Sequence, residues 1–252
     1  MKKISTLLCG TILFFALGTS AQTVKKSVAK KSASSKTVKA KKPVTKKAEH
    51  TIKDLAADPS IKIKLTTDSG IIIMKLYDST PLHRDNFAKL VNDKFYDSLL
   101  FHRVIQGFMI QGGDPMSKNA VSGSQLGMGG GDMTRIPGEF RTSLIHKKGV
   151  LAAARDNNPE KASSACQFYI VQGKTYSEQE LSSFELGRGM KYTPQQRIAY
   201  KTMGGTPMLD QNYTVFGEVI SGLEVIDKIA TVQKDQNNRP LGDIRMKMEL
   251  VK

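Results

Sequence analysis

The segment IKIKLTTDSGIIIMKLY, residues 61–77, alternates apolar and polar side chains on both sides of a short polar turn. Ile61, Ile63 and Leu65 therefore share one face of an extended strand. Asp68-Ser69-Gly70 supplies the turn, and residues 71–77 return along the first strand. The pattern predicts a β-hairpin with one buried face, and it places the start of the folded part near Ile61.

The next segment, STPLHRDNFAKLVNDKF at 79–95, changes to a helical period. Thr80 is suited to cap the helix and Pro81 to its first position, while Phe87, Leu90 and Val91 form the buried stripe. His83 in the first turn is interpreted as structural or exposed, not as a ligand. A second amphipathic helix is predicted at 222–230. Strands are predicted at 100–106, 108–112, 149–154, 166–172, 213–219 and 243–251. Many strands with a helix near each end favour an antiparallel barrel with helical caps.

Residues 176–205 interrupt this order of strands. The run TPQQRIAYKTMGG begins with Thr193 as a cap and Pro194 at the first helical position. Gln196 completes a capping box, and Gly204-Gly205 ends the helix. We therefore expect a helical insertion on the barrel at 176–205.

The N-terminus has the pattern of an export signal. Lys2 and Lys3 precede a short apolar run at 7–17, and small residues end at Ala21. We expect a signal peptide at 1–21, a disordered Lys/Ser/Ala-rich linker at 22–57 and one folded domain at 58–252. The expected location is outside the cytoplasm, with the periplasm favoured over a lipoprotein or a secreted protein.

Most of the positive charge lies in the linker. The net charge is +15, and residues 24–50 hold ten lysines against one glutamate. A segment with this composition cannot bury enough apolar area to offset its ordering entropy. The linker is interpreted as a solubilising spacer, with contact to anionic envelope surfaces as the alternative. Specific nucleic-acid binding is disfavoured because no aromatic residues are interleaved with the lysines. Nothing in the folded part suggests an obligate dimer, and a monomer is expected.

Several kinds of chemistry find no support in the motifs. The four histidines, at 50, 83, 102 and 146, show no pair at metal-ligand spacing. Cys166 precedes the apolar run QFYIV, which favours a packed thiol over a nucleophile. The glycine-rich GMGGGD at 127–132 lacks the Lys-Ser/Thr of a phosphate loop. Neither a metal nor another cofactor is predicted.

The stretch FHRVIQGFMIQGGDP at 101–115 combines an arginine with aromatic, apolar and amide side chains. It resembles the signature of cyclophilin-type peptidyl-prolyl cis-trans isomerases. GVLAAAR at 149–155, CQFYIV at 166–171 and LDQNYTVFGEVISGLEVIDKI at 209–229 match later segments of that family in order and at similar spacing. The resemblance covers about 60–252, apart from the insertion.

The resemblance implies a mainly β fold, a closed eight-stranded antiparallel barrel capped by two helices, and isomerisation of X-Pro bonds in peptides and folding proteins. It assigns Arg103 as the catalytic donor to the proline nitrogen and Gln111 as the group that orients the substrate backbone. Ala154 and Arg155 would offer backbone groups to an extended peptide, and Gln167 would lie in the same groove. The proline pocket would be lined by Phe108, Met109, Tyr169 and Leu209, with Tyr213 also binding the substrate.

Four positions depart from the family pattern. Tyr169 and Tyr213 stand where the family often has Phe and His, and both replacements keep an aromatic ring. Arg155 replaces an Asn and would favour acidic residues before proline. Met208 stands where a Trp often helps to bind cyclosporin, so weak cyclosporin binding is expected. We also expect the insertion to wall one side of the groove and narrow substrate choice.

Two other kinds of function remain open from the sequence. The domain would be a chaperone module that binds Pro-containing segments without turnover if the catalytic donor were lost, yet Arg103 is present. Alternatively, the basic segment at 24–50 would carry the main function as an envelope tether. Catalysis by the domain without that segment separates the last reading from an isomerase.

Overall fold

The computed structural model describes residues 59–251. The signal peptide and linker predicted at 1–57 lie outside the described residues. Within the described part, no helix is both long and apolar enough to cross a membrane.

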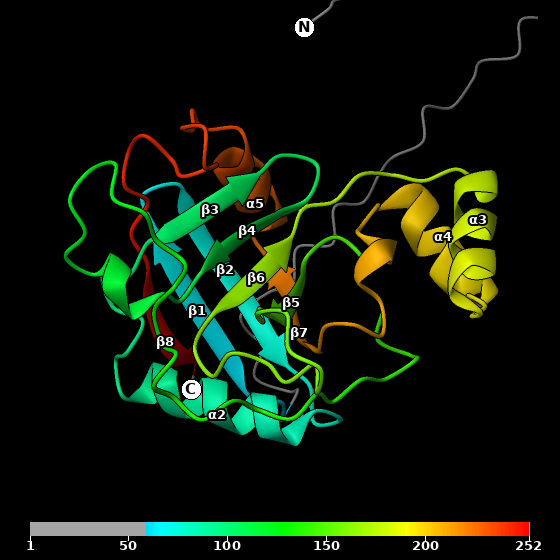
Figure 1. Cartoon of the computed structure of the whole chain (residues 1–252), viewed down its shortest axis with the longest axis horizontal. Helices are drawn as coiled ribbons and strands as arrows, with labels where there is room; N and C mark the ends of the chain where they lie inside the picture. Colours follow the sequence, from blue (N-terminus) through cyan, green and yellow to red (C-terminus); the bar gives the residue numbers. More distant parts are fainter. Residues whose placement is uncertain (1–58, 252) are drawn as a thin grey trace, which may run out of the picture. The chain divides into compact units, whose positions relative to one another are not determined.

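Eight strands form one antiparallel sheet in the order β3-β4-β6-β5-β7-β2-β1-β8 (Figure 1). The strands are β1 (Lys62–Thr67), β2 (Gly70–Leu76), β3 (Phe101–Ile105), β4 (Met109–Gly112), β5 (Val150–Ala153), β6 (Phe168–Val171), β7 (Val215–Ser221) and β8 (Lys247–Val251). The predicted hairpin is confirmed as β1 and β2, with Thr67 opposite Gly70 at its closed end. The other strands also overlap the predicted segments.

The two edge strands, β3 and β8, form no ladder with each other, and the contact along this edge is made mainly by residues that flank them. The contact consists of one isolated bridge, Leu100 with Arg245, and backbone hydrogen bonds such as Phe101 N to Ile244 O at 3.0 Å. The sheet is thus curled and open along this edge. The prediction of an eight-stranded antiparallel sheet is confirmed, but its closure into a barrel is not.

Two helices cover opposite ends of the curled sheet (Figure 1). Helix α2 (Pro81–Asn92) contacts β7 and β8, and α5 (Leu223–Ala230) contacts β2, β3 and β4. The predicted stripe of Phe87, Leu90 and Val91 is buried on α2. These are the two capping helices expected from the sequence.

The predicted cap of α2 is wrong in its chemistry. Thr80 occupies the N-cap position, but its side chain makes no capping hydrogen bond. The carboxylate of Glu139 instead accepts from Leu82 N at 3.3 Å and from His83 N at 3.0 Å. It also bonds the His83 ring at 2.7 Å, and Ser163 bonds the other ring nitrogen. Burial lowers the pKa of His83, which is a structural residue as predicted.

The insertion contains α3 (Glu178–Arg188) and α4 (Pro194–Thr202), which lie beside each other outside the sheet (Figure 1). The predicted capping box of Thr193 and Gln196 is present, and Ser177 forms a second one with Glu180. Two short 3-10 turns complete the described elements, η1 (Pro115–Ser117) and η2 (Pro207–Leu209).

Alternation along β6 separates two apolar clusters. Phe168 and Ile170 belong to the main core, together with Phe87 and Val225 from the capping helices. Tyr169 and Val171 point to a smaller cluster with Met109 and Val215, and Phe108, Leu209 and Tyr213 are packed against it. Because side chains of a strand alternate between faces, this register places Tyr169 on the face that carries the site.

Candidate active site

The β3–β4 hairpin positions the predicted donor. Arg103 is paired with Gln111 across the ladder, and Arg103 Nη1 donates to Gln111 Oε1 at 3.2 Å. The turn between the strands uses Gly107, whose φ of +74° suits a residue without a Cβ. Gly107 N also donates to the side chain of Gln172 at 2.6 Å, which fixes the turn. Arg103 remains half-buried, with its charge at the rim of the sheet.

Neighbouring strands bring the other predicted residues to the same place. Gln111 of β4 is opposite Tyr169 of β6, and Tyr169 is opposite Ala152 of β5. Leu209 ends the η2 turn. A cavity of about 90 Å³ lies where these elements converge. The residues that line it are Arg103, Phe108, Met109, Gln111, Ala154, Arg155, Tyr169, Leu209 and Tyr213.

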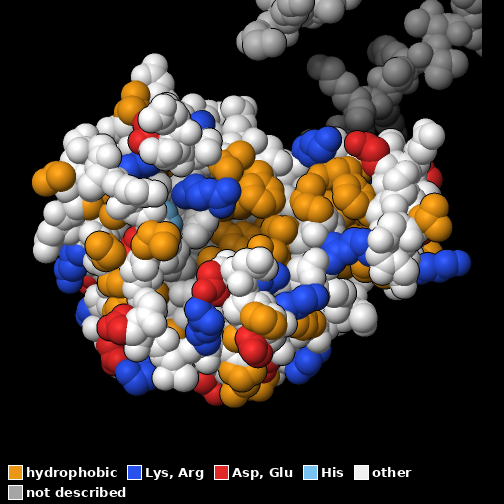
Figure 2. All heavy atoms as spheres, viewed as in Figure 1, with side chains coloured by type: hydrophobic (Ala, Val, Ile, Leu, Met, Phe, Trp, Pro, Cys, Tyr) orange, Lys and Arg blue, Asp and Glu red, His pale blue; other side chains and the backbone are white. Residues whose placement is uncertain are grey.

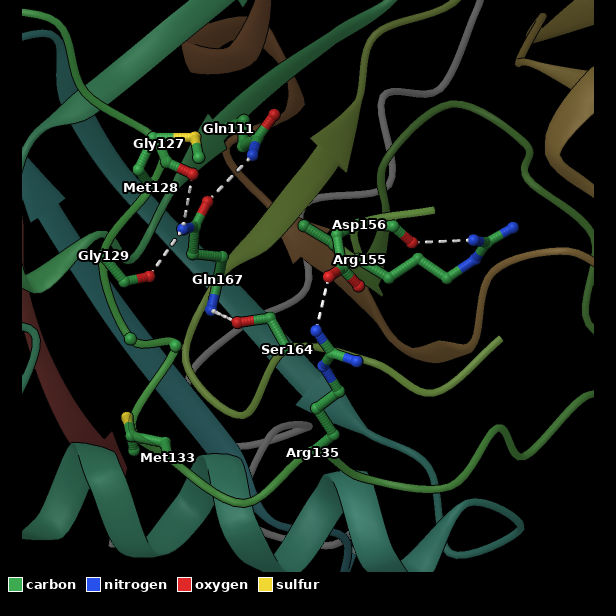
Figure 3. Close-up of a pocket in the computed structure, with 13 residues that line it drawn as sticks. Gln111, Gly127, Met128, Gly129, Met133, Arg135, Arg155, Asp156, Ser164 and Gln167 are labelled. Atoms are coloured by element: carbon green, nitrogen blue, oxygen red, sulfur yellow. Dashed lines mark hydrogen bonds and ion pairs between the residues drawn. The ribbon is translucent and has the colours of Figure 1, made fainter. Parts of the chain in front are cut away.

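These nine residues are all among the ten predicted for the site, and the tenth, Gln167, lies next to them. Gln111 Nε2 donates to Gln167 Oε1 at 3.1 Å, and Gln167 Nε2 donates to the carbonyls of Gly127 and Gly129 at 3.0 and 2.9 Å (Figure 3). A continuous chain of hydrogen bonds therefore runs from Arg103 to the glycine-rich loop. Since each amide is both donor and acceptor, this chain fixes which way the Gln111 amide points.

The glycine-rich loop forms one side of a second, larger cavity of about 330 Å³ (Figure 3). The two cavities share Gln111, Ala154 and Arg155 in their walls. Asp114, fully buried, holds the loop by accepting from Gly127 N at 2.5 Å. The sequence analysis assigned no site to this loop, because it lacks the Lys-Ser/Thr of a phosphate loop.

Arg155 is already engaged by the protein. Its Nε donates to Asn212 O at 3.0 Å, its Nη1 donates to Asp156 O at 2.8 Å, and the guanidinium lies 4.7 Å from the centre of the Tyr213 ring. This geometry favours a wall-forming role over a free cation for acidic substrates. The Ala154 amide likewise donates to Gln167 O at 2.9 Å, and the Ala154 carbonyl accepts from Ser164 N at 2.9 Å. Only the second lone pair of that carbonyl is left for a peptide.

Tyr169 leads to a buried network that sequence reasoning missed. Its hydroxyl lies 3.0 Å from His146 Nε2, and His146 Nδ1 lies 2.8 Å from Asp210 Oδ1. Burial first, then the nearby Tyr213 and Asp210, raises the pKa of Tyr169, so its hydroxyl stays protonated. His146 and Asp210 are 64 residues apart, and no local pattern in the sequence signals their contact.

The site offers hydrogen-bond donors and an apolar seat. Burial raises the pKa of the Cys166 thiol, which packs in the main core as predicted, away from nucleophilic chemistry. Among the described residues, no cluster of three His, Cys, Asp or Glu side chains is arranged to hold a metal ion. Figure 2 shows apolar side chains gathered in a hollow on the viewed face, with Lys and Arg at its rim. Such a surface suits an extended peptide with an apolar anchor.

Comparison with known proteins settles the family. The family described as cyclophilin-type peptidyl-prolyl cis-trans isomerase/CLD matches residues 62–249. This chain is a cyclophilin. Membership makes it a peptidyl-prolyl cis-trans isomerase, as the resemblance implied. The match spans β1 to β8 and includes the insertion.

Curated relatives and solved structures agree with this assignment. A Staphylococcus epidermidis protein assigned to the peptidyl-prolyl cis-trans isomerases is 35% identical over 191 residues, covering 74% of this cyclophilin and 89% of the relative. A Staphylococcus aureus protein with the same assignment is 35% identical over 188 residues, covering 73% and 88%. A Cryptosporidium parvum cyclophilin, solved in the presence of the dipeptide Ala-Pro, shares the fold with a TM-score of 0.54 and 22% identity, covering 76% and 99%.

Proposed function

We propose that this isomerase rotates X-Pro bonds in extended segments of proteins that fold in the cell envelope, with the 90 Å³ cavity as the seat of the proline ring. The observation that carries the proposal is the convergence of Arg103, Gln111 and an apolar, aromatic wall on one cavity. The envelope location rests on the export pattern at 1–21 and the lysine-rich segment that follows it. The Ala-Pro dipeptide present with the Cryptosporidium cyclophilin supports a proline peptide as the ligand class.

The chemistry needs no covalent intermediate. Resonance holds the X-Pro amide planar with a barrier of about 18–20 kcal/mol, and twisting the bond returns a lone pair to the proline nitrogen. Arg103 carries a guanidinium that stays charged at any working pH and is the donor to that nitrogen. Its bond to Gln111 holds it at the cavity rim before the substrate arrives. Because the nitrogen accepts a hydrogen bond only when the amide is twisted, this interaction favours the transition state.

The remaining cavity residues hold the substrate. Phe108, Met109 and Leu209 seat the apolar ring, while the Gln111 amide is oriented to bond a substrate backbone group. A peptide with its proline in the smaller cavity continues across the shared wall at Ala154 and Arg155 into the larger cavity. Shortening isomerisation from tens of seconds to milliseconds requires about 10⁴-fold, or roughly 5–6 kcal/mol. Preorganised electrostatics and binding of the twisted form supply free energies of this size.

A protease-coupled assay on Ala-Xaa-Pro-Phe peptides tests the catalytic proposal. The full chain is compared with Arg103→Ala and with the control Arg245→Ala, whose exposed side chain bonds Ser98 O and Lys118 O outside the cavity. We expect Arg103→Ala to lower kcat at least a hundredfold and the control to retain turnover. A folded parent that binds the peptide without accelerating isomerisation would instead identify a chaperone module without catalysis.

The envelope location is tested separately by cell fractionation. The full chain is expected with the periplasmic fraction, and a chain without residues 1–21 is expected in the cytoplasm. Recovery of the full chain in the cytoplasm would overturn this part of the proposal without affecting the catalytic part. Partition with anionic envelope material, lost on removal of 24–50, would assign a role to the lysines.

A further inference from the structure

The insertion does not contribute to the wall of the proline cavity. None of the nine residues that line the cavity belongs to 176–205. The expectation that the insertion walls the groove is therefore not met at this cavity. Two side chains of the insertion nevertheless bond one buried carboxylate, that of Asp210, which directly follows Leu209 of the cavity wall.

Asp210 is fully buried, and the insertion supplies two of the four hydrogen bonds to its carboxylate. Tyr192 and Tyr200 both donate their hydroxyls to Asp210 Oδ2, at 2.8 and 2.5 Å. His146 supplies the other half, with its backbone N at 2.7 Å and its ring Nδ1 at 2.8 Å from Oδ1. A buried carboxylate is stable only when its oxygens are bonded, so the two tyrosines are required partners.

One route runs from Asp210 to Tyr169. A carboxylate only accepts hydrogen bonds, so His146 Nδ1 carries the proton that it shares with Asp210. On the other side of the ring, His146 Nε2 lies 3.0 Å from the Tyr169 hydroxyl. The His146 and Tyr169 rings are also stacked, with centres 6.1 Å apart. The carboxylate thereby fixes the orientation of the histidine ring and, through it, the position of the Tyr169 ring in the cavity wall.

A second route runs from the insertion to Leu209. Arg188, the last residue of α3, donates to three carbonyls around the η2 turn. These are Pro207 O at 3.2 Å, Met208 O at 2.7 Å and Asp210 O at 2.5 Å. The guanidinium thus closes around the turn that presents Leu209 to the cavity. The two routes are independent, since one passes through side chains and the other through backbone carbonyls.

From these two routes we infer that the insertion is a positioning element for the residues that hold the proline ring. Tyr192 and Tyr200 act on Tyr169 through the side chains of Asp210 and His146. Arg188 acts on Leu209 through the backbone of the η2 turn. The inference rests on the proposed function of the cavity. The seat touches the proline ring, which keeps its shape while the amide twists. Loosening the seat therefore weakens ground state and transition state alike and raises KM, whereas the loss of the Arg103 donor lowers kcat.

The test uses the double variant Tyr192→Phe/Tyr200→Phe, which keeps both rings of the insertion core and removes both hydroxyls from Asp210. Tyr176→Phe is the matched control, because Tyr176 packs in the same cluster and is not among the partners of Asp210. We expect the double variant to raise KM for a short Xaa-Pro peptide about fivefold to tenfold with kcat within twofold. The side-chain ¹⁵N NMR signals of His146 should shift in the double variant alone.

A folded double variant with the KM of the parent would overturn the inference, as would an equal rise in KM for Tyr176→Phe. If the double variant does not fold, Arg188→Met is measured by the same KM criterion, and an unchanged KM there also overturns it. Absence of turnover in the parent would overturn the proposed function instead. The dissociation constant of the same peptide then replaces KM, and an unchanged constant in the variant counts against the inference.

Discussion

Arg103 and Gln111 face each other across the β3–β4 ladder, with Arg103 Nη1 3.2 Å from Gln111 Oε1. The contact joins the Arg103 guanidinium to the Gln111 amide, whose nitrogen donates to Gln167. Arg103 is thus held by a chain of amides and not by a carboxylate. An amide leaves the positive charge of the guanidinium uncompensated, which strengthens its bond to a developing lone pair.

Gln167→Leu should disturb catalysis without touching Arg103. The variant removes the bond to Gln111 and both bonds to the loop carbonyls, so the Gln111 amide loses its fixed orientation. We expect kcat/KM to fall about tenfold, equivalent to about 1.4 kcal/mol. Gln179→Leu, at an exposed position of α3, is the control in the same peptide assay. Equal activity of the two variants would show that the amide chain does not position the site.

Acid should destabilise the fold through His102. Burial is the main cause that lowers the pKa of His102 to about 4, from an ordinary value of 6.5. Between pH 4 and 6.5 the unfolded state therefore binds more protons than the folded state, so stability rises with pH in this window. His102→Gln should reduce this slope by up to about 1.4 kcal/mol per pH unit, measured by urea unfolding at pH 4.5 and 7. An unchanged slope would contradict the assignment.

The cap of α2 predicts an asymmetry between two variants. Glu139→Ala leaves the amides of Leu82 and His83 and the His83 ring without their carboxylate. We expect a loss of about 1–3 kcal/mol in the free energy of unfolding, typical of buried donors left unpaired. Thr80→Val removes a hydroxyl that does not cap and should cost less than about 1 kcal/mol. Thermal or urea unfolding that gives the reverse order would show that Thr80 is the true cap.

The residue at position 208 should determine how tightly cyclosporin binds. The side chain of Met208 is 40% exposed on the η2 turn beside Leu209, at the position where the family often carries Trp. A flexible thioether covers less of a bound macrocycle than an indole does. We expect weak cyclosporin binding by the parent and at least tenfold tighter binding by Met208→Trp, measured by titration calorimetry. Nanomolar binding by the parent would refute the prediction.

The parts of the fold that depend on residues close in sequence could be predicted from the local pattern of apolar side chains. The alternation around Ile63 and Leu65 indicated the β1–β2 hairpin, and the spacing of Phe87 and Leu90 indicated the buried face of α2. The cavity residues were predicted from the resemblance to a family. The apolar pattern around Phe108 does not distinguish a residue of a pocket wall from a residue of the core. Ordinary strand packing accounts for the same pattern.

The parts that could not be predicted depend on distant residues. Glu139 reaches the first turn of α2 from 56 residues away, so Thr80 was the only cap visible locally. The pairing of His146 with Asp210 spans 64 residues, and its two tyrosine partners belong to the insertion. Whether β3 and β8 form a ladder depends on the curl of the whole sheet, which a strand count does not contain.

The ends of the insertion meet at one point. Lys174 and Gly205 form an isolated bridge, and Gly205 also bridges Lys147, so 176–205 leaves and rejoins the chain side by side. A Cβ at Gly205 would lie 2.2 Å from His146 O, so only glycine allows this close approach. The insertion therefore begins and ends at one paired point of the chain, the bridge between Lys174 and Gly205. A shorter connection between Lys174 and Gly205 would leave the register of β6 and β7 unchanged. The length and sequence of the insertion can therefore vary without a change in the order of the strands.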